Sequence, residues 1–145
     1  MKVVVQRCDR ASCIVSNKVV GKIDKGVMLL VGFTHTDKID NIKYMVDKVI
    51  NLRIFDDENG IMNKSLRDIG GSILSISQFT LYGDASKGRR PSYINAMKGN
   101  EATVLYDKFN ELLREENVKV ETGVFGAEMK IDFVNDGPIT ILLEK

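Results

Sequence analysis

The stretch KVVVQRCDRASCIVS, residues 2–16, decides the fold of this chain. Its odd positions carry one apolar set: Val3, Val5, Ala11, Cys13 and Val15. A two-residue period of this kind is typical of a long β-strand with one buried face. Arg7 and Asp9 interrupt that face, and a buried guanidinium needs acceptors. Asp9 is the simplest partner for Arg7, and exposed main-chain carbonyls elsewhere are the alternative.

Two more strands follow this one. Residues 19–23 and 27–33 are rich in valine, leucine and isoleucine, and Asp24-Lys25-Gly26 separates them. A short polar segment that ends in glycine favours a turn, so we predict that these two strands form a hairpin. The first third of the chain is then a β-meander.

Helical periodicity occurs twice. Apolar residues recur at three- and four-residue spacing after Asp37, a plausible N-cap, and predict a helix that ends near Asn51. A second amphipathic helix is predicted over residues 101–116. Between the two helices, residues 53–55 and 61–63 flank Asp57-Glu58-Asn59-Gly60, which indicates a short β-hairpin.

The second half of the chain supplies the remaining strands. Residues 72–82 predict a buried strand whose far end turns polar, and residues 83–99 resemble a loop. Residues 128–134 alternate cleanly, and an extended pattern resumes at 139–143 after the turn-like Asn135-Asp136-Gly137-Pro138. We therefore expect one α+β domain over residues 1–145, with a largely antiparallel, barrel-like sheet and two main helices.

Composition excludes several classes of protein. The 145 residues are 43% hydrophobic, and 21 basic against 20 acidic residues leave a net charge of +1. This balance argues against disorder and against wholesale coating of nucleic acid, although it permits a local basic patch. The apolar runs are too short to span a bilayer and no signal peptide is evident, so we expect no membrane association and a cytoplasmic location.

The chain has few residues for metal binding or for acid–base catalysis. It contains two cysteines and one histidine, which argues against a structural zinc site, and we expect no metal and no other cofactor. A Ser-His-Asp or Cys-His triad would have to use His35. That residue lies between a predicted strand end and the Asp37 cap, so a surface loop is the better interpretation.

Two segments remain as candidate sites. Residues 77–83 read Ser-Gln-Phe-Thr-Leu-Tyr-Gly, so that a strand ends in hydroxyl and amide groups beside a glycine. Residues 135–140 read Asn-Asp-Gly-Pro-Ile-Thr. On composition alone, an amphipathic strand end is the favoured interpretation of the first segment. Spacing alone does not reject an ordinary turn for the second.

These two segments, taken in order, resemble the two signature motifs of the D-aminoacyl-tRNA deacylases. The similarity extends over the whole chain and includes residues 1–7, 52–55 and 122–127. It implies an enzyme that hydrolyses the ester between a D-amino acid, or glycine on a mismatched tRNA, and the tRNA 3′ end. It also implies a homodimer with its site shared across the interface, and no cofactor.

The resemblance assigns roles to particular residues. It places Ser77, Gln78, Phe79 and Thr80 at the catalytic site, where the main-chain amides of Gln78 and Phe79 would stabilise the oxyanion. The 2′-hydroxyl of the terminal adenosine would assist, and Thr80 would position substrate or water.

Chiral selection is assigned to a second set of residues: Gly137, Pro138, Arg7 and Met129. The resemblance implies a cis bond between Gly137 and Pro138, whose carbonyls enter the site of the partner subunit and exclude an L side chain. Arg7 would donate to main-chain carbonyls near this pair and fix their direction.

One dense basic run follows the first motif, at residues 87–90. Lys87, Arg89 and Arg90 are candidates for contact with acceptor-stem phosphates, and a solvated mobile loop is the alternative. Two other functions stay open for the chain as a whole. One is a non-catalytic tRNA-binding module of the same fold, and the other is a hydrolase of small acyl esters that does not need tRNA.

Overall fold

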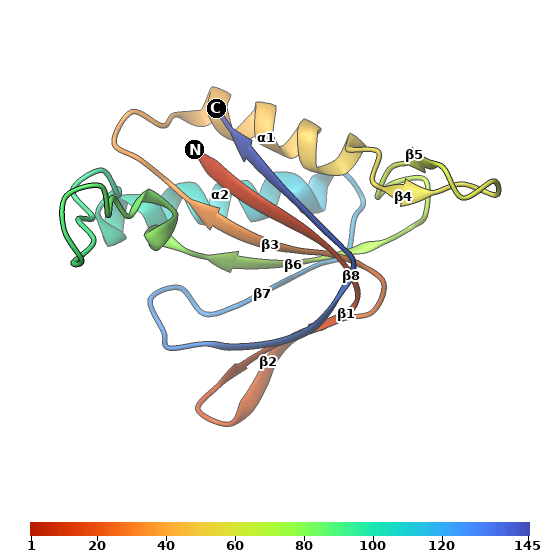
Figure 1. The fold of residues 1–145 in the computed structure, drawn as a ribbon, viewed down its shortest axis with the longest axis horizontal. Helices are drawn as coiled ribbons and strands as arrows, with labels where there is room; N and C mark the ends of the chain where they lie inside the picture. Colours follow the sequence, from red (N-terminus) through yellow and green to blue (C-terminus); the bar gives the residue numbers. More distant parts are fainter.

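The computed structural model describes residues 1–145 as a curved sheet with two helices packed on one side of it (Figure 1). The strand order is β2-β1-β3-β6-β7, and β8 pairs with β1. The strands of this sheet are β1 (Lys2–Val15), β2 (Lys18–Ile23), β3 (Gly26–Gly32), β6 (Ser72–Ser77), β7 (Val120–Thr122) and β8 (Lys130–Glu144). The helices are α1 (Ile39–Asn51) and α2 (Gly99–Glu115). The predicted α+β fold, with a largely antiparallel, barrel-like sheet and two main helices, is confirmed.

The first hairpin is formed by β1 and β2, not by the two segments, 19–23 and 27–33, that were predicted to pair. Val15 pairs with Lys18, so the chain reverses at Ser16 and Asn17, whose φ values of 49° and 62° are those of a tight two-residue turn. Strands β2 and β3 then follow each other along one edge of β1, while β8 occupies the other edge. The predicted hairpin at Asp24-Lys25-Gly26 is therefore wrong, because β2 and β3 both pair with β1 and this segment only connects them.

The rest of the sheet brings the helices onto one face. Strands β3 and β6 are parallel, as are β6 and β7, and parallel neighbours require a crossover. Helix α1 lies in the crossover between β3 and β6, and α2 lies in the one between β6 and β7. A small hairpin of β4 (Phe55–Asp56) and β5 (Met62–Lys64) confirms the predicted turn over residues 57–60.

The core has two parts, one on each face of the sheet. A cluster of 21 buried residues fills the space between the sheet and the helices, and Phe109, Leu113 and Met45 are among its fully buried members. A smaller cluster of seven residues, which includes both free cysteines, Cys8 and Cys13, lies inside the curve of the sheet. No helix of the structure is long and apolar enough to cross a membrane.

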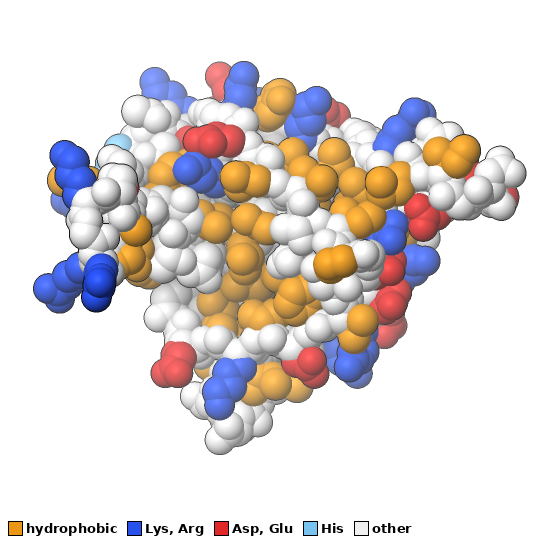
Figure 2. All heavy atoms as spheres, viewed as in Figure 1, with side chains coloured by type: hydrophobic (Ala, Val, Ile, Leu, Met, Phe, Trp, Pro, Cys, Tyr) orange, Lys and Arg blue, Asp and Glu red, His pale blue; other side chains and the backbone are white.

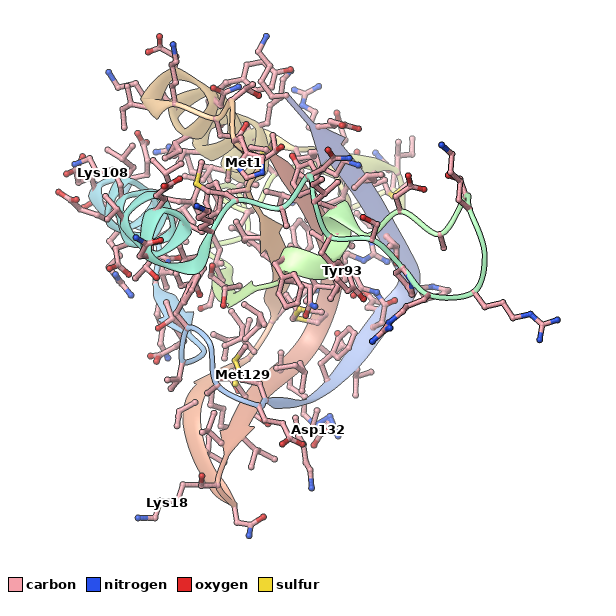
Figure 3. The ribbon with its side chains drawn as sticks, turned by 90° about the vertical axis from the view of Figure 1, so that its left-hand side faces the viewer. Met1, Lys18, Tyr93, Lys108, Met129 and Asp132 are labelled. Carbon is pink, nitrogen blue, oxygen red and sulfur yellow. The ribbon has the colours of Figure 1, made fainter.

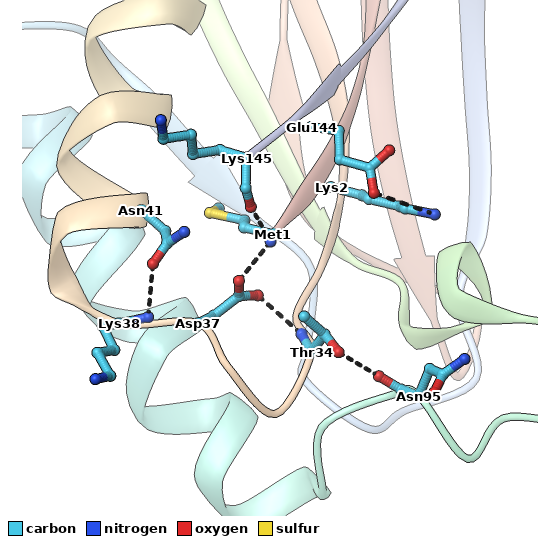
Figure 4. Close-up of polar contacts among 9 residues, drawn as sticks. All are labelled: Met1, Lys2, Thr34, Asp37, Lys38, Asn41, Asn95, Glu144 and Lys145. Carbon is cyan, nitrogen blue, oxygen red and sulfur yellow. Dashed lines mark hydrogen bonds and ion pairs between the residues drawn. The ribbon is translucent and has the colours of Figure 1, made fainter.

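Several predicted element ends differ from the structure. Helix α1 begins at Ile39 with Lys38 as the N-cap, because the carboxylate of Asp37 accepts a hydrogen bond from the N–H of Thr34 instead (Figure 4). Helix α2 begins two residues earlier than predicted, at Gly99, and ends at Glu115. The predicted turn at residues 135–138 is wrong, since β8 continues through it with a shift of register against β1 near Cys8.

Gly26 provides a test of how tightly β3 and β6 pack. A Cβ atom at this position would lie 1.9 Å from the carbonyl oxygen of Ser72, its partner across the parallel ladder. Gly26→Ala is therefore expected to lower the free energy of unfolding by about 3 kcal/mol, measured as a lower urea midpoint. Gly99→Ala is the matched control, because its Cβ meets nothing closer than 4.0 Å and alanine favours the helix. Equal midpoints for the two variants would contradict this account.

Candidate active site

The first candidate motif lies where β6 ends and a short 3-10 helix, η1 (Phe79–Tyr82), begins. The prediction that the strand continues to Tyr82 is wrong, because the backbone leaves the sheet at Gln78 and closes a turn from Gly83 N–H to the carbonyl of Thr80 over 2.9 Å. Gly32 of β3 makes room for this turn. A Cβ at Gly32 would lie 2.9 Å from the Gln78 carbonyl oxygen and 3.2 Å from Leu81.

A cleft of about 230 Å³ lies beside this turn. Its walls are largely apolar and include no acidic, basic or histidine side chain. The lining residues are Val31, Gly32, Phe33, Ile76, Ser77, Gln78, Phe79, Met97, Ala102, Phe125, Gly126, Ala127, Met129 and Ile131. In the view of Figure 2, apolar side chains gather across the middle of the molecule, between the helices and the β1–β2 hairpin.

The cleft brings together three of the four predicted catalytic residues, Ser77, Gln78 and Phe79, with Met129. Phe79 is 56% exposed, and its ring packs edge-on against Tyr93 at 5.0 Å between centroids. Figure 3 looks onto this end of the molecule and shows Tyr93 and Met129 on the same side. Ser77, Gln78, Phe79 and Met129 are thus placed to contact one ligand.

Thr80 is exposed and lies just outside the cleft lining. Its hydroxyl accepts a hydrogen bond from the side-chain amide of Gln78. The phenol of Tyr82, in the same turn, stays protonated, because burial, and then the negative charges of Asp37 and Glu144, raise its pKa. Thr80 therefore has a fixed orientation but no activating partner.

The main-chain amides of the motif differ from one another. Gln78 N–H donates to the carbonyl of Val31 over 2.7 Å, so it extends the parallel ladder beyond Ser77. The prediction that the Gln78 amide forms half of an oxyanion site therefore does not fit this structure. Phe79 is the first residue of η1, and an amide in that position has no acceptor within its own helix.

Arg7 is buried, with 7% of its surface exposed, and its guanidinium holds three segments together. It donates to the carbonyl of Ile54 over 2.8 Å, and its Nε lies 2.8 Å from a carboxylate oxygen of Asp136. A carboxylate oxygen of Asp56 lies 3.6 Å from Nη1, the nitrogen that donates to Ile54. The prediction of Asp9 as partner is wrong, because the register shift near Cys8 leaves Asp9 exposed.

The second candidate motif lies outside the cleft. The peptide bond between Gly137 and Pro138 is cis, and both residues are exposed on β8. The amide of Asn135 fixes this segment by donating to the carbonyls of Arg7 and Ile139, over 2.9 and 3.0 Å. No hydrogen bond joins Arg7 to the carbonyl of Gly137 or Pro138, so the expected contact is replaced by the one with Asp136. Within one chain, the two motifs are not brought together.

The remaining candidates are on the surface. Lys87, Arg89 and Arg90 are exposed on the loop after η1 and take part in no ion pair, and Figure 2 shows basic side chains over this end of the molecule. His35 is exposed, with Nε2 2.9 Å from the carbonyl oxygen of Ile94, and does not line the cleft. No group of three or more histidine, cysteine or acidic side chains is close enough to hold a metal ion.

A cleft with apolar walls and a few polar groups at one rim is typical of a binding site for a small organic group. Here the polar groups are the main-chain amide of Phe79, the side-chain amide of Gln78 and the hydroxyl of Ser77. A site of this class acts by positioning its ligand and by hydrogen bonding, since it offers no ionisable side chain.

Comparison with known proteins identifies the family. Residues 4–144 match the family described as D-Tyr-tRNA(Tyr) deacylase. The chain is 57% identical to a D-aminoacyl-tRNA deacylase of Bacillus velezensis, over 99% of this chain and 98% of the relative. A solved structure named c-Myc DNA Unwinding Element Binding Protein superposes with a TM-score of 0.94 at 40% identity, covering 100% of this chain and 99% of that one. The chain belongs to the D-Tyr-tRNA(Tyr) deacylase family, a family of hydrolases that cleave an ester bond.

One relative has a name that denies the deacylase activity. A Bacillus subtilis protein named Inactive D-aminoacyl-tRNA deacylase is 59% identical over 127 residues, which cover 88% of this chain and 96% of that protein. High similarity in this family therefore includes a member named as inactive.

Proposed function

We propose that this protein removes D-amino acids, and glycine attached to the wrong tRNA, from the 3′ end of tRNA as a chiral proofreading step in cytoplasmic translation. The observation that carries the proposal is the composition of the cleft, which holds no ionisable side chain and has the start of η1 at its rim. Such a site suits an aminoacyl ester, because this bond is already labile and needs no protein nucleophile.

The chemistry uses the main chain and the substrate. Water attacks the ester carbonyl carbon, and the π electrons of the carbonyl bond move to the carbonyl oxygen. The N–H of Phe79 donates to the oxyanion that forms. The tetrahedral intermediate then collapses, the bond to the ribose oxygen breaks, and the proton lost by water ends on that oxygen. The neighbouring 2′-hydroxyl of the terminal ribose relays this proton. One well-placed donor supplies about 2.7–4 kcal/mol of transition-state stabilisation.

The other residues of the first motif position the substrate. The side-chain amide of Gln78 holds the Thr80 hydroxyl, and we assign this pair to orienting the ribose or the attacking water. Ser77 and Met129 line the cleft, where they contact the amino acid. None of these four side chains is assigned a proton-transfer role.

Selection for the D configuration requires groups that contact the α-carbon, and we assign them to Gly137 and Pro138 of a second subunit. The main-chain carbonyls of this pair would hold the substrate amino group and leave no space for an L side chain. The exposure of both residues, and their absence from the cleft of their own chain, support a homodimer with shared sites. Arg7 holds this segment through Asp136.

The basic loop is assigned to the acceptor stem. Replacing Arg89 and Arg90 by glutamine is expected to weaken tRNA binding and to reduce the slope of log Kd against log salt concentration by about 1.5, since each phosphate contact contributes roughly 0.7–0.9. Lys18→Gln with Lys22→Gln is the matched control, because both lysines are exposed on β2, away from the cleft. An unchanged slope for the arginine variant would remove the loop from the tRNA interface.

The decisive experiment follows the loss of ester from D-Tyr-tRNA and L-Tyr-tRNA in parallel, with a chelator present. Rapid loss of the D form alone would support the proposed function. Loss of both esters would remove the chiral role of Gly137 and Pro138. Loss of neither ester, with tRNA still bound, would favour the alternative of a non-catalytic tRNA-binding module. The Bacillus subtilis relative that is named as inactive is the reason to test this alternative. Free D-amino acid esters serve as the control for an esterase that does not need tRNA.

A further inference from the structure

Two aromatic rings and an isoleucine are exposed next to the cleft. Phe79, Tyr93 and Ile94 are 56%, 40% and 79% exposed, and we call these three side chains the ledge. The rings of Phe79 and Tyr93 meet edge-on, with 5.0 Å between their centroids and an angle of 71° between their planes. A contiguous group of exposed large apolar side chains is typical of a surface that binds a partner.

The protein holds the Tyr93 ring in place. The N–H groups of Asp84 and Ser92 each donate to the carbonyl of the other residue over 2.8 Å, so Tyr93 follows directly after a closed pair. A Cβ at Gly83 would lie 3.0 Å from a ring carbon of Tyr93, so glycine lets the ring lie against the backbone there. A ring that is already fixed loses little conformational entropy when a ligand contacts it.

The segment that follows Tyr93 is also attached to the rest of the protein. The hydroxyl of Thr34 donates to the carbonyl of Asn95 over 2.7 Å, and Nε2 of His35 lies 2.9 Å from the carbonyl oxygen of Ile94. The ledge is therefore anchored on both sides of Tyr93, although its side chains are exposed.

A basic loop lies directly before the ledge in the chain. The pair of Asp84 and Ser92 closes residues 85–91, which carry the exposed basic run Lys87-Gly88-Arg89-Arg90, and this run takes part in no ion pair. The carboxylate of Asp84, at the base of the loop, accepts the N–H of Ser86 over 2.9 Å. Figure 3 shows Tyr93 next to η1, with this loop extending to one side. Exposed rings and unpaired positive charges therefore lie next to each other.

This combination of side chains suits single-stranded RNA. Unpaired bases stack on aromatic rings, and the phosphates of the same strand attract lysine and arginine. A purely apolar partner would cover the rings but leave the charges of the basic loop unmatched. The ledge and the loop together therefore favour an RNA strand as the occupant.

Phe79 connects the ledge to the cleft. Its side chain belongs to both, whereas Tyr93 and Ile94 do not line the cleft. A strand whose last nucleotide carries the ester in the cleft therefore reaches the ledge before it reaches the basic loop. The 3′ end of tRNA is single-stranded, so the nucleotide at this point of the path has an unpaired base.

We propose that Tyr93 is a stacking site for the base that precedes the terminal adenosine of tRNA, with Phe79 and Ile94 at its sides. This contact makes hydrolysis depend on the RNA as well as on the amino acid, because a small acyl ester does not reach the ledge. The identity of the RNA as an aminoacyl-tRNA rests on the proposed function, whereas stacking on Tyr93 does not require hydrolysis.

The first measurement uses an uncharged RNA hairpin that copies the acceptor stem and the 3′ end. The fluorescent base 2-aminopurine replaces the base before the terminal adenosine, and its emission is quenched when it stacks on an aromatic ring. We expect quenching by the unchanged chain and by Tyr93→Phe. Tyr93→Leu keeps an apolar side chain without a ring, so we expect little quenching and about tenfold weaker binding.

Tyr44→Leu is the matched control. Tyr44 is also 40% exposed, and the ammonium groups of Lys48 and Lys145 lie 5.5 and 4.8 Å from its ring centroid, but it lies on α1 and does not line the cleft. This substitution is expected to leave both the quenching and the RNA affinity as in the unchanged chain. Equal quenching by Tyr93→Leu and Tyr44→Leu would overturn the stacking site.

Deacylation separates a stacking site from a general loss of structure. The two substrates are D-Tyr-tRNA and D-tyrosyl adenosine, which has no preceding nucleotide. Tyr93→Leu is expected to lower kcat/KM for D-Tyr-tRNA about tenfold relative to kcat/KM for D-tyrosyl adenosine, mainly through KM. Equal losses on the two substrates would contradict the proposal, because Tyr93 would then only support Phe79 and the cleft.

The fluorescence and the deacylation distinguish this proposal from the proposed function. Quenching that depends on Tyr93, with no deacylation by the unchanged chain, would support the stacking site and contradict the enzymatic assignment. Deacylation of D-Tyr-tRNA by the unchanged chain, with quenching that does not depend on Tyr93, would support the enzymatic assignment and contradict the stacking site.

Discussion

Phe79→Pro is expected to lower kcat for deacylation of D-Tyr-tRNA by about 10²–10³-fold, while the substrate still binds. Proline removes the N–H that we assign to the oxyanion and leaves no other donor at that atom. The first position of a helix tolerates proline, because its N–H has no partner there and the fixed φ suits the helix. The fold around η1 is therefore expected to survive the substitution.

Phe79→Ala is the control that isolates the amide. It removes the same ring and its packing on Tyr93 but keeps the N–H, so it is expected to change KM and to lower kcat by less than about tenfold. Single-turnover rates at saturating enzyme compare the chemical step in both variants. Equal losses of kcat in the proline and alanine variants would mean that the Phe79 ring matters and the amide does not.

The sequence predicted the number and type of most elements because their side-chain periods are regular. The predictions failed where backbone conformation or backbone packing, rather than side-chain pattern, determines the course of the chain. Ser16 and Asn17 adopt positive φ without a glycine, so the true hairpin turn had no clear signal, whereas Gly26 resembled a turn residue. Gly26 is glycine because β6 approaches it too closely for any side chain. That contact involves residues far apart in the chain and is not visible in a local pattern.

The site shows the same limit. The periodicity predicted a strand that continues to Tyr82, but the chain turns at Gln78. The N–H of Gln78 donates to the carbonyl of Val31. Which main-chain amide is free for a ligand therefore depends on where the strand ends. A shift of that end by one residue changes the free amide. Arg7 was correctly noted as a charge on an apolar face, but its partners Ile54 and Asp136 come from distant segments. A pattern in sequence finds such a residue without finding its acceptors.

Two impaired variants are expected to restore activity when they are combined in one dimer of the proposed kind. Gly137→Ala places a Cβ 2.8 Å from a side-chain carbon of Ile139 and 2.9 Å from its main-chain nitrogen, at a φ of 111° that alanine rarely adopts. The segment must shift, and in the proposed dimer its carbonyls would then no longer meet a substrate in the opposite subunit. We expect this homodimer to lose at least about tenfold in deacylation of D-Tyr-tRNA and in selectivity over the L form. The Phe79→Pro homodimer fails in the other half of the site.

A heterodimer of these two variants can be purified through two different C-terminal tags, and a shared site would leave it with one site carrying both substitutions and one carrying neither. If each site takes Phe79 from one chain and Gly137 from the other, the heterodimer is expected to show about half of the wild-type kcat with wild-type selectivity, because the two sites act independently. If each site is built within a single chain, both sites carry a substitution and the mixture is no better than the variants alone. The separation of Gly137 from the cleft of its own chain leads us to expect the first result. The second result would contradict the shared site while leaving the role of the Phe79 amide intact.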